Sequence, residues 1–406
     1  MSNIWLFVLL VVAVALGWIM GRIGRSTSGH IAEDKFTQEL PQGLPKSYYF
    51  RGLNYLINEQ PDGAIDAFVA ALEVNSETLE THIALGNLLR RRGEVDRAIR
   101  VHQNLLARPS LDKSQLHQAQ LELAKDYIAA GLLDRAERLL VDLADVSAEL
   151  KAVCLKHLTE IYRDEREWKK AIAAASILNG NFNSKLLSTG KRRSEFNVPL
   201  SHFCCEIADE ALKIEDYREV RKQVREALYY DKSCVRANLL LSKLEYDQGH
   251  YAEAIKILSR IPQQNPDFIP ESIDLIVKCY SELGDTEALK KYLESCLDAH
   301  HGMALLLPIT DKLKQEEGEQ KAASFLADQL KKQPSIQGVS HYLDLQLQTT
   351  DGEQKQTLTL LKEMIDKLLL KRPKYRCKRC GFSGTQLHWL CPSCKEWGEV
   401  RAIEGE

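Results

Sequence analysis

The feature that most constrains this chain is an internal repeat of about 34 residues. The first unit has five apolar or small residues at offsets of 0, +3, +12, +16 and +19: Gly52, Tyr55, Ala64, Phe68 and Ala71. One small position recurs farther along at steps of 34, in Ala254, Ala288 and Ala322. A small residue lets two antiparallel helices approach closely, and a larger apolar side chain fills the space beside it. The period therefore predicts stacked helical hairpins, each of which buries its apolar face only against its neighbours.

This spacing resembles that of tetratricopeptide repeats over roughly residues 48–333. Turn signals such as Gly93-Glu94 and Gly249-His250 separate the expected helices. We predict an all-α superhelical solenoid over residues 47–370, with about eight repeats and a degenerate ninth near residues 340–370. Solenoids present long surfaces that bind protein segments. Because paired carboxylates, a Ser/His/Asp set and a glycine-rich nucleotide loop are lacking, and His82, His117 and His157 occur singly, we expect no enzyme.

One connection differs from the others. Residues 179–199 are polar and longer than the neighbouring turns, so they predict a loop, and they hold Lys191, Arg192 and Arg193 together. The loop is either simply solvated or docks an acidic partner or lipid head groups.

The N-terminus predicts a membrane anchor over residues 1–23. Ile4 to Met20 carry no charge, and with the following residues the span is long enough to cross a bilayer. No cation precedes the run, as a cleaved signal peptide would require, and Arg22 and Arg25 follow it. Positive charge stays on the cytoplasmic side, so we expect a periplasmic N-terminus and a cytoplasmic body. Residues 24–46, rich in Gly, Ser and Pro, predict a cytoplasmic linker.

Charge and cysteine usage fit a cytoplasmic body. The formal net charge is −3, which argues against a chain held on nucleic acid by a general basic field. Six of the ten cysteines lie scattered in helical patterns and are expected to be small buried hydrophobes in a reducing compartment: Cys154, Cys204, Cys205, Cys234, Cys279 and Cys296.

The other four cysteines predict a metal site. Cys377, Cys380, Cys391 and Cys394 form two C-x2-C pairs separated by ten residues, a spacing that brings four thiolates to one tetrahedral centre. The form C-x2-C-G … C-P-x-C resembles rubredoxin knuckles, so residues 371–406 predict a rubredoxin-like domain with one metal ion, iron favoured and zinc as the alternative. The short loop and Lys395, at the position of a usual glycine, favour a structural role over electron transfer.

Two further features of this region suggest contacts. Aromatic residues are expected to cover a small metal-centred core: Phe382, Trp389 and Trp397. Six cations fall within nine residues around the first cysteine pair: Lys371, Arg372, Lys374, Arg376, Lys378 and Arg379. They could form a plain solvated linker or bind anionic lipid, an acidic protein or nucleic acid. A membrane-held chain makes nucleic acid the partner we do not expect.

The order of anchor, repeats and terminal knuckle, closed by CKRCGF and WLCPSCKEWG, resembles the lipopolysaccharide assembly protein B family over the whole chain. The resemblance implies an inner-membrane protein with Cys377, Cys380, Cys391 and Cys394 as metal ligands. It also implies an adaptor that helps a membrane-bound AAA+ protease degrade the deacetylase committing to lipid A synthesis. It further implies a scaffold for other lipopolysaccharide-synthesis or membrane regulatory proteins.

Two other functions remain open from the residues: a redox or electron-transfer protein using the knuckle, and a nucleic-acid binder using the basic stretch. In the adaptor, the knuckle would either cap the last repeats or form a partner site of its own.

Overall fold

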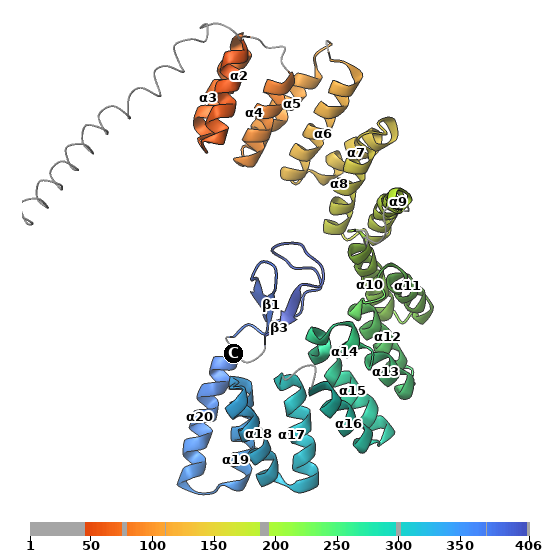
Figure 1. Ribbon diagram of the computed structural model, residues 1–406, viewed down its shortest axis with the longest axis vertical. Coiled ribbons are helices and arrows are strands. Elements are labelled where there is room, and N and C mark those ends of the chain that lie inside the picture. Colours follow the sequence, from red (N-terminus) through yellow and green to blue (C-terminus); the bar gives the residue numbers. More distant parts are fainter. Residues whose placement is uncertain are drawn as a thin grey trace, which may run out of the picture. The chain divides into compact units, whose positions relative to one another are not determined.

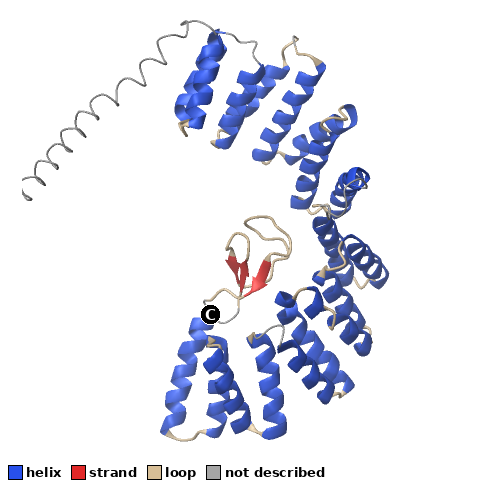
Figure 2. Cartoon of the chain, in the orientation of Figure 1, coloured by secondary structure: helices blue, strands red, loops and turns tan. Residues whose placement is uncertain are grey.

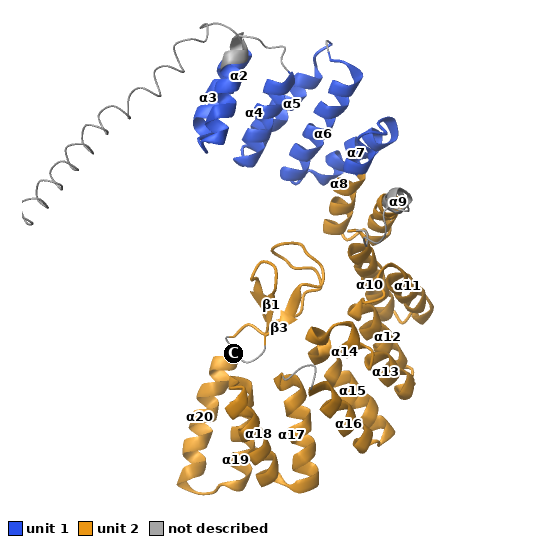
Figure 3. Ribbon diagram, in the orientation of Figure 1, with its two compact units in different colours: residues 1–154 blue, residues 155–406 orange. Residues whose placement is uncertain are grey.

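The computed structural model describes residues 45–74, 79–109, 111–186, 195–297, 302–370 and 372–403. The predicted anchor at residues 1–23 and nearly all of the predicted linker lie outside these ranges. Within them, no helix is both long enough and apolar enough to span a bilayer. The chain divides into two compact units, residues 1–154 and 155–406, which Figure 3 shows in separate colours.

The first unit is built of helical hairpins. The pairs are α2 (Pro45–Ile57) with α3 (Pro61–Val74), α4 (Leu79–Arg91) with α5 (Val95–Leu106), and α6 (Lys113–Ala129) with α7 (Leu133–Val146). Gly93 and Gly131 turn the chain with φ of 81° and 72°, a left-handed conformation that glycine adopts without strain. The unit boundary falls inside α8 (Lys151–Asp164).

The small positions of the repeat act as the spacing predicts. A Cβ atom on Gly52 would lie 2.5 Å from the ring of Phe68, and one on Gly86 would lie 2.4 Å from the ring of His102. Ala64 and Phe68 are fully buried in the same apolar cluster. Close approach of the two helices is therefore what each small residue provides.

The second unit continues with α9 (Trp168–Leu186), α10 (Asn197–Lys213), α11 (Tyr217–Tyr230), α12 (Val235–Asp247) and α13 (Tyr251–Leu258). Then come the short α14 (Ile261–Gln264) and 3-10 helix η1 (Pro266–Phe268), followed by α15 (Ile269–Leu283) and α16 (Thr286–Leu297). The last helices are α17 (Met303–Glu317), α18 (Glu319–Lys332), α19 (Ile336–Thr349) and α20 (Glu353–Leu370). Figure 1 shows these helices as successive pairs, in agreement with a tetratricopeptide-type all-helical solenoid.

Two details correct the sequence interpretation. Both ends of the predicted loop at residues 179–199 are helical, because α9 continues to Leu186 and α10 begins at Asn197, while residues 187–194 lie outside the described ranges. Its cations, Lys191 to Arg193, lie outside the described residues. The last helix pair begins at Ile336, four residues before the predicted start, where the Ser335 side chain accepts a hydrogen bond from the backbone N–H of Gly338 and caps α19.

The described strands belong to the terminal knuckle, drawn red in Figure 2. Strand β1 (Tyr375–Cys377) lies between β2 (Ser383–Gly384) and β3 (Val400–Ala402), and both pairings are antiparallel. The sheet is too short to supply much core of its own, so the domain depends on other contacts.

Candidate metal centre and its docking surface

The four cysteines of the knuckle converge on one point. Their sulfur atoms all lie within 4.8 Å of one another, with 3.8 Å between Cys377 and Cys394 and 3.6 Å between Cys380 and Cys391. A tetrahedral site with metal–sulfur bonds of about 2.3 Å requires sulfur–sulfur distances of about 3.8 Å. The donor set therefore fits one metal ion of the zinc or iron type. Which of the two it holds stays a prediction.

Local backbone geometry sets these sulfurs in place. The N–H of Gly381 donates to the carbonyl of Cys377, and the N–H of Lys395 donates to the carbonyl of Cys391, both at 3.0 Å. Gly381 and Lys395 are left-handed, with φ of 77° and 57°. The two turns are thus equivalent, and the lysine takes a conformation that glycine adopts more readily. The backbone N–H of Phe382 lowers the pKa of the exposed Cys380 thiol to about 6, which favours the thiolate that a metal needs.

The tryptophans of the knuckle contact the solenoid, which differs from the expected metal-centred core. The indole of Trp397 is buried and stacks on the imidazole of His202 in α10, with ring centroids 4.8 Å apart and 15° between the planes. The indole of Trp397 also contacts the ring of Phe203 in an edge-to-face arrangement, with centroids 5.8 Å apart. Gly398 passes so close that a Cβ atom there would lie 3.4 Å from Nε2 of His202.

A second contact lies on α12 and η1. Trp389 stacks on Phe268 with centroids 5.1 Å apart and 28° between the planes. The buried guanidinium of Arg236 lies 5.7 Å from the centroid of the Trp389 indole and forms a 2.7 Å ion pair with Glu206. A cation over an indole face is attracted by the ring, and more strongly when water is excluded.

Asp267 of η1 links the solenoid to the knuckle through two ion pairs. Its carboxylate lies 2.5 Å from Nζ of Lys378 and 3.4 Å from Nε of Arg401, whose guanidinium also covers the ring of Phe268 at 3.9 Å. Burial of this carboxyl works toward a higher pKa, but the two cations outweigh it and the pKa is lowered. Asp267 is therefore held as a carboxylate in the interface.

These contacts place the knuckle on the middle of the second unit. The hypothesis that it caps the last repeats is wrong, because its partners lie on α10, α12 and η1 rather than on α17 to α20. Two cations of the basic stretch are engaged in ion pairs, Lys378 with Asp267 and Arg379 with Glu396.

Comparison with known proteins agrees with this architecture. A family model described as "Rubredoxin metal binding domain" matches residues 375–401, and tetratricopeptide-repeat models match residues 81–116 and 211–279. Lipopolysaccharide assembly protein B of Escherichia coli (strain K12) is 32% identical over 401 residues, which cover 98% of each chain. The protein of that name from Haemophilus influenzae is 33% identical over 410 residues, covering 99% of this chain and 98% of the relative. This chain belongs to the lipopolysaccharide assembly protein B family.

In this family member, the residues that dock the knuckle escaped the sequence interpretation. The sequence interpretation did not single out His202, Arg236 or Asp267. One signal was available: His202 and Arg236 are 34 residues apart, so they occupy the same position of successive repeats. A bulky polar residue at a matching position in neighbouring repeats indicates a shared contact surface.

The burial predicted for the six scattered cysteines is confirmed in this family member, although a hydrogen bond with the Cys205 thiol lowers the pKa of Cys234 to about 7. All are buried and none is disulfide-bonded. Burial raises the pKa of Cys154 and of Cys279 to about 11, so these thiols stay protonated and act as small hydrophobes.

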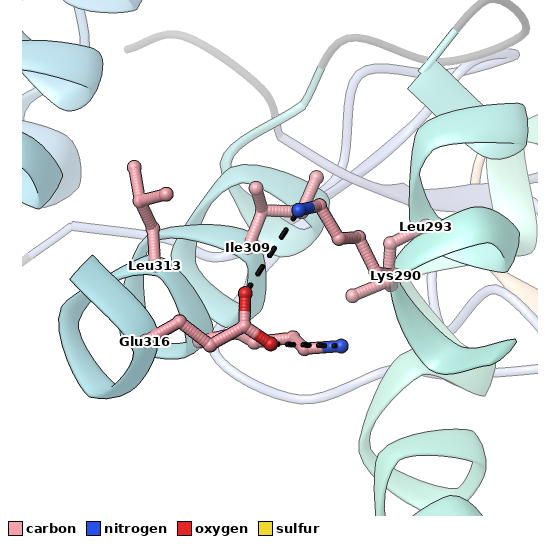
Figure 4. A pocket seen from close by; sticks show the side chains of 6 residues that line it. Lys290, Leu293, Ile309, Leu313 and Glu316 are labelled. Carbon is pink, nitrogen blue, oxygen red and sulfur yellow. Dashed lines mark ion pairs between the residues drawn. The ribbon is translucent and has the colours of Figure 1, made fainter. Parts of the chain in front are cut away.

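A small cavity between α16 and α17 offers no second site. It has a volume of about 30 Å³, enough for a water molecule and little more, and Figure 4 shows the lining side chains. Glu316 lies 3.6 Å from Lys312 and 3.8 Å from Lys290, so its polar groups already pair with one another. The lining is Lys290, Leu293, Ile309, Lys312, Leu313 and Glu316.

Proposed function

We propose that this chain is a regulator of lipopolysaccharide biosynthesis that works as an adaptor and not as an enzyme. It would bring the deacetylase that commits to lipid A synthesis to a membrane-bound AAA+ protease, and would gather other lipopolysaccharide-synthesis or membrane regulatory proteins. The observation that carries the proposal is the end-to-end match to relatives named lipopolysaccharide assembly protein B, over 98% of both chains.

The physical basis of such an adaptor is effective concentration. Two partners held on one body meet as if at millimolar concentration, without any new contact between them. The predicted anchor at residues 1–23 would keep the body on the cytoplasmic face of the inner membrane, with the N-terminus in the periplasm. The solenoid supplies extended surface for partners. The knuckle ties α10, α12 and η1 together and would keep that surface in one shape.

The test is the steady-state level of the deacetylase in cells depleted of this protein. We expect the level to rise, and to return when the full chain is supplied. A chain without residues 1–25 should fail to restore it, whereas a chain with an unrelated single-pass anchor in place of residues 1–23 should succeed. A deacetylase level that does not respond to depletion contradicts the proposal.

A further inference from the structure

The last helix of the solenoid leaves an apolar surface uncovered. No residue of α20 is buried, and four large side chains are 61, 46, 57 and 55% exposed: Leu360, Leu361, Met364 and Leu368. Three of them recur every four residues and the fourth is adjacent, so they share one side of the helix. We call these four residues the α20 stripe.

Among the side chains that the structure describes, the earlier helices of the second unit show no such stripe, because the next helix covers each of them. Helix α12 packs on α11, and α19 packs on α18. Helix α20 packs on α19, and the chain that follows leaves for the knuckle, whose contacts lie on α10, α12 and η1. Figure 1 shows α20 as the final helix of its row. A solenoid normally closes with a polar outer face, so an apolar one indicates a partner.

We propose that the α20 stripe is the contact surface of a homodimer, in which α20 of two copies pack antiparallel about a two-fold axis near Met364. This axis brings Met364 against its own counterpart and places Leu360 opposite the partner subunit's Leu368. An apolar patch that meets itself in this way forms a closed, isologous contact.

The charges beside the α20 stripe favour a second copy of this chain as the partner. Glu363 and Lys367 lie one turn apart on the same edge of α20, both are exposed, and neither forms an ion pair with another described residue. In the antiparallel arrangement each carboxylate of Glu363 approaches the partner's Lys367, which gives two ion pairs. In a parallel arrangement this edge would face the opposite edge of the partner helix, and the two ion pairs could not form.

Charge balance argues against a lipid surface at this position. Helix α20 carries three acidic and three basic residues: Glu353, Glu363, Asp366, Lys355, Lys362 and Lys367. Helices that lie on anionic membranes carry an excess of cations on their polar face. A helix with equal numbers of acidic and basic residues is better matched to a second copy of itself than to an anionic membrane.

The size of the stripe sets the strength of the contact. One helix face is smaller than the roughly 800 Å² per partner of a standard stable interface. The dimer should therefore be weak and depend on concentration.

The first test is site-directed cross-linking of the full chain in membranes with a short bismaleimide. Met364→Cys should give a covalent dimer, because the two thiols lie near the axis. Thr359→Cys, which is exposed on the opposite side of the same helix, should not, and neither should the unmodified chain. Equal cross-linking at residues 359 and 364, or no dimer at 364, overturns the proposal, as does a covalent product with a different protein.

A charge exchange tests the arrangement in purified full chain by sedimentation in detergent. Glu363→Lys should weaken dimerisation about tenfold, since two attractive pairs become repulsive. Adding Lys367→Glu to the same chain should restore it, because the pairs re-form with signs reversed. Two results would rule out the antiparallel α20 contact. One is unchanged dimerisation in Glu363→Lys, and the other is weak dimerisation that persists in the double variant. A chain that stays monomeric at all concentrations rules out the dimer itself.

Discussion

The imidazole of His202 lies nearly parallel to the indole of Trp397, with 4.8 Å between the ring centroids and 15° between the planes. The two residues come from different domains: His202 from the repeat solenoid and Trp397 from the metal knuckle. Both are buried, so the stack excludes water and fixes the knuckle on α10.

We predict that His202→Ala releases the knuckle. The substitution removes the stacking partner of Trp397 and leaves a cavity, a change that costs about 2–4 kcal/mol at a buried site. Amide hydrogens of residues 375–402 should then exchange faster, while those of α17 and α18 keep their rates. His250→Ala is the matched control, because that side chain is 61% exposed. Unchanged exchange in His202→Ala would mean that the stack does not hold the knuckle.

The same histidine should make docking sensitive to acid. Burial lowers the pKa of His202 to about 3, with Arg236 and Arg401 acting in the same direction. An unfolded histidine titrates near pH 6.5, so below that pH the unfolded chain binds a proton that the folded chain does not. The neutral His202 therefore contributes its full share to the free energy of unfolding above about pH 6.5. This share falls continuously as the pH is lowered toward 3.

Between pH 7 and pH 5 this loss amounts to about 2 kcal/mol. Urea unfolding of the second unit, followed by tryptophan fluorescence at the two pH values, measures it. His202→Gln cannot take up the proton, so its stability should change less over the same interval. Protonation of the cysteines affects both chains and cancels in the comparison. If both chains lose the same stability, His202 is not the cause.

Removing the metal ligands should unfold the knuckle alone. Cys377→Ser combined with Cys380→Ser leaves two thiolates, too few for a tetrahedral site, and the three short strands have little core without a metal. We expect loss of bound metal by elemental analysis and fast exchange over residues 375–402, with helical circular dichroism almost unchanged. The same elemental analysis of the unsubstituted chain identifies iron or zinc. A protected knuckle without metal would contradict the assignment.

The close approach of α4 and α5 should not tolerate a methyl group. Gly86→Ala would place Cβ 2.4 Å from the ring of His102, which cannot move freely because its Nδ1 lies 2.5 Å from the buried carboxylate of Asp126. We expect a loss of about 1–3 kcal/mol, seen as faster exchange in residues 79–129.

Gly180→Ala is the matched control for this change. Gly180 is also helical, but nothing lies within 4 Å of its Cβ position. Its substitution should stabilise α9 by about 1 kcal/mol through helix propensity alone. Equal effects at the two positions would show that the contact with His102 is not limiting.

The local spacing of residues was enough to predict the solenoid and the four-cysteine site. Gly52 and Phe68 are sixteen residues apart in one helical hairpin, and Cys377 and Cys380 share one turn. Such contacts depend on the geometry of a single hairpin or turn, which short-range patterns encode. The burial of the scattered cysteines follows from the same periodicity.

The docking of the knuckle was decided only by the tertiary structure. Trp389 and Trp397 were expected to cover a metal-centred core, yet their partners are Phe268 and His202. The polar connection at residues 179–199 likewise has helix at both ends, up to Leu186 and from Asn197. Contacts between distant segments depend on how successive hairpins stack and on where the chain returns after α20. Neither is contained in the spacing of any one repeat, because the stacking angle is set by packing between side chains of neighbouring repeats.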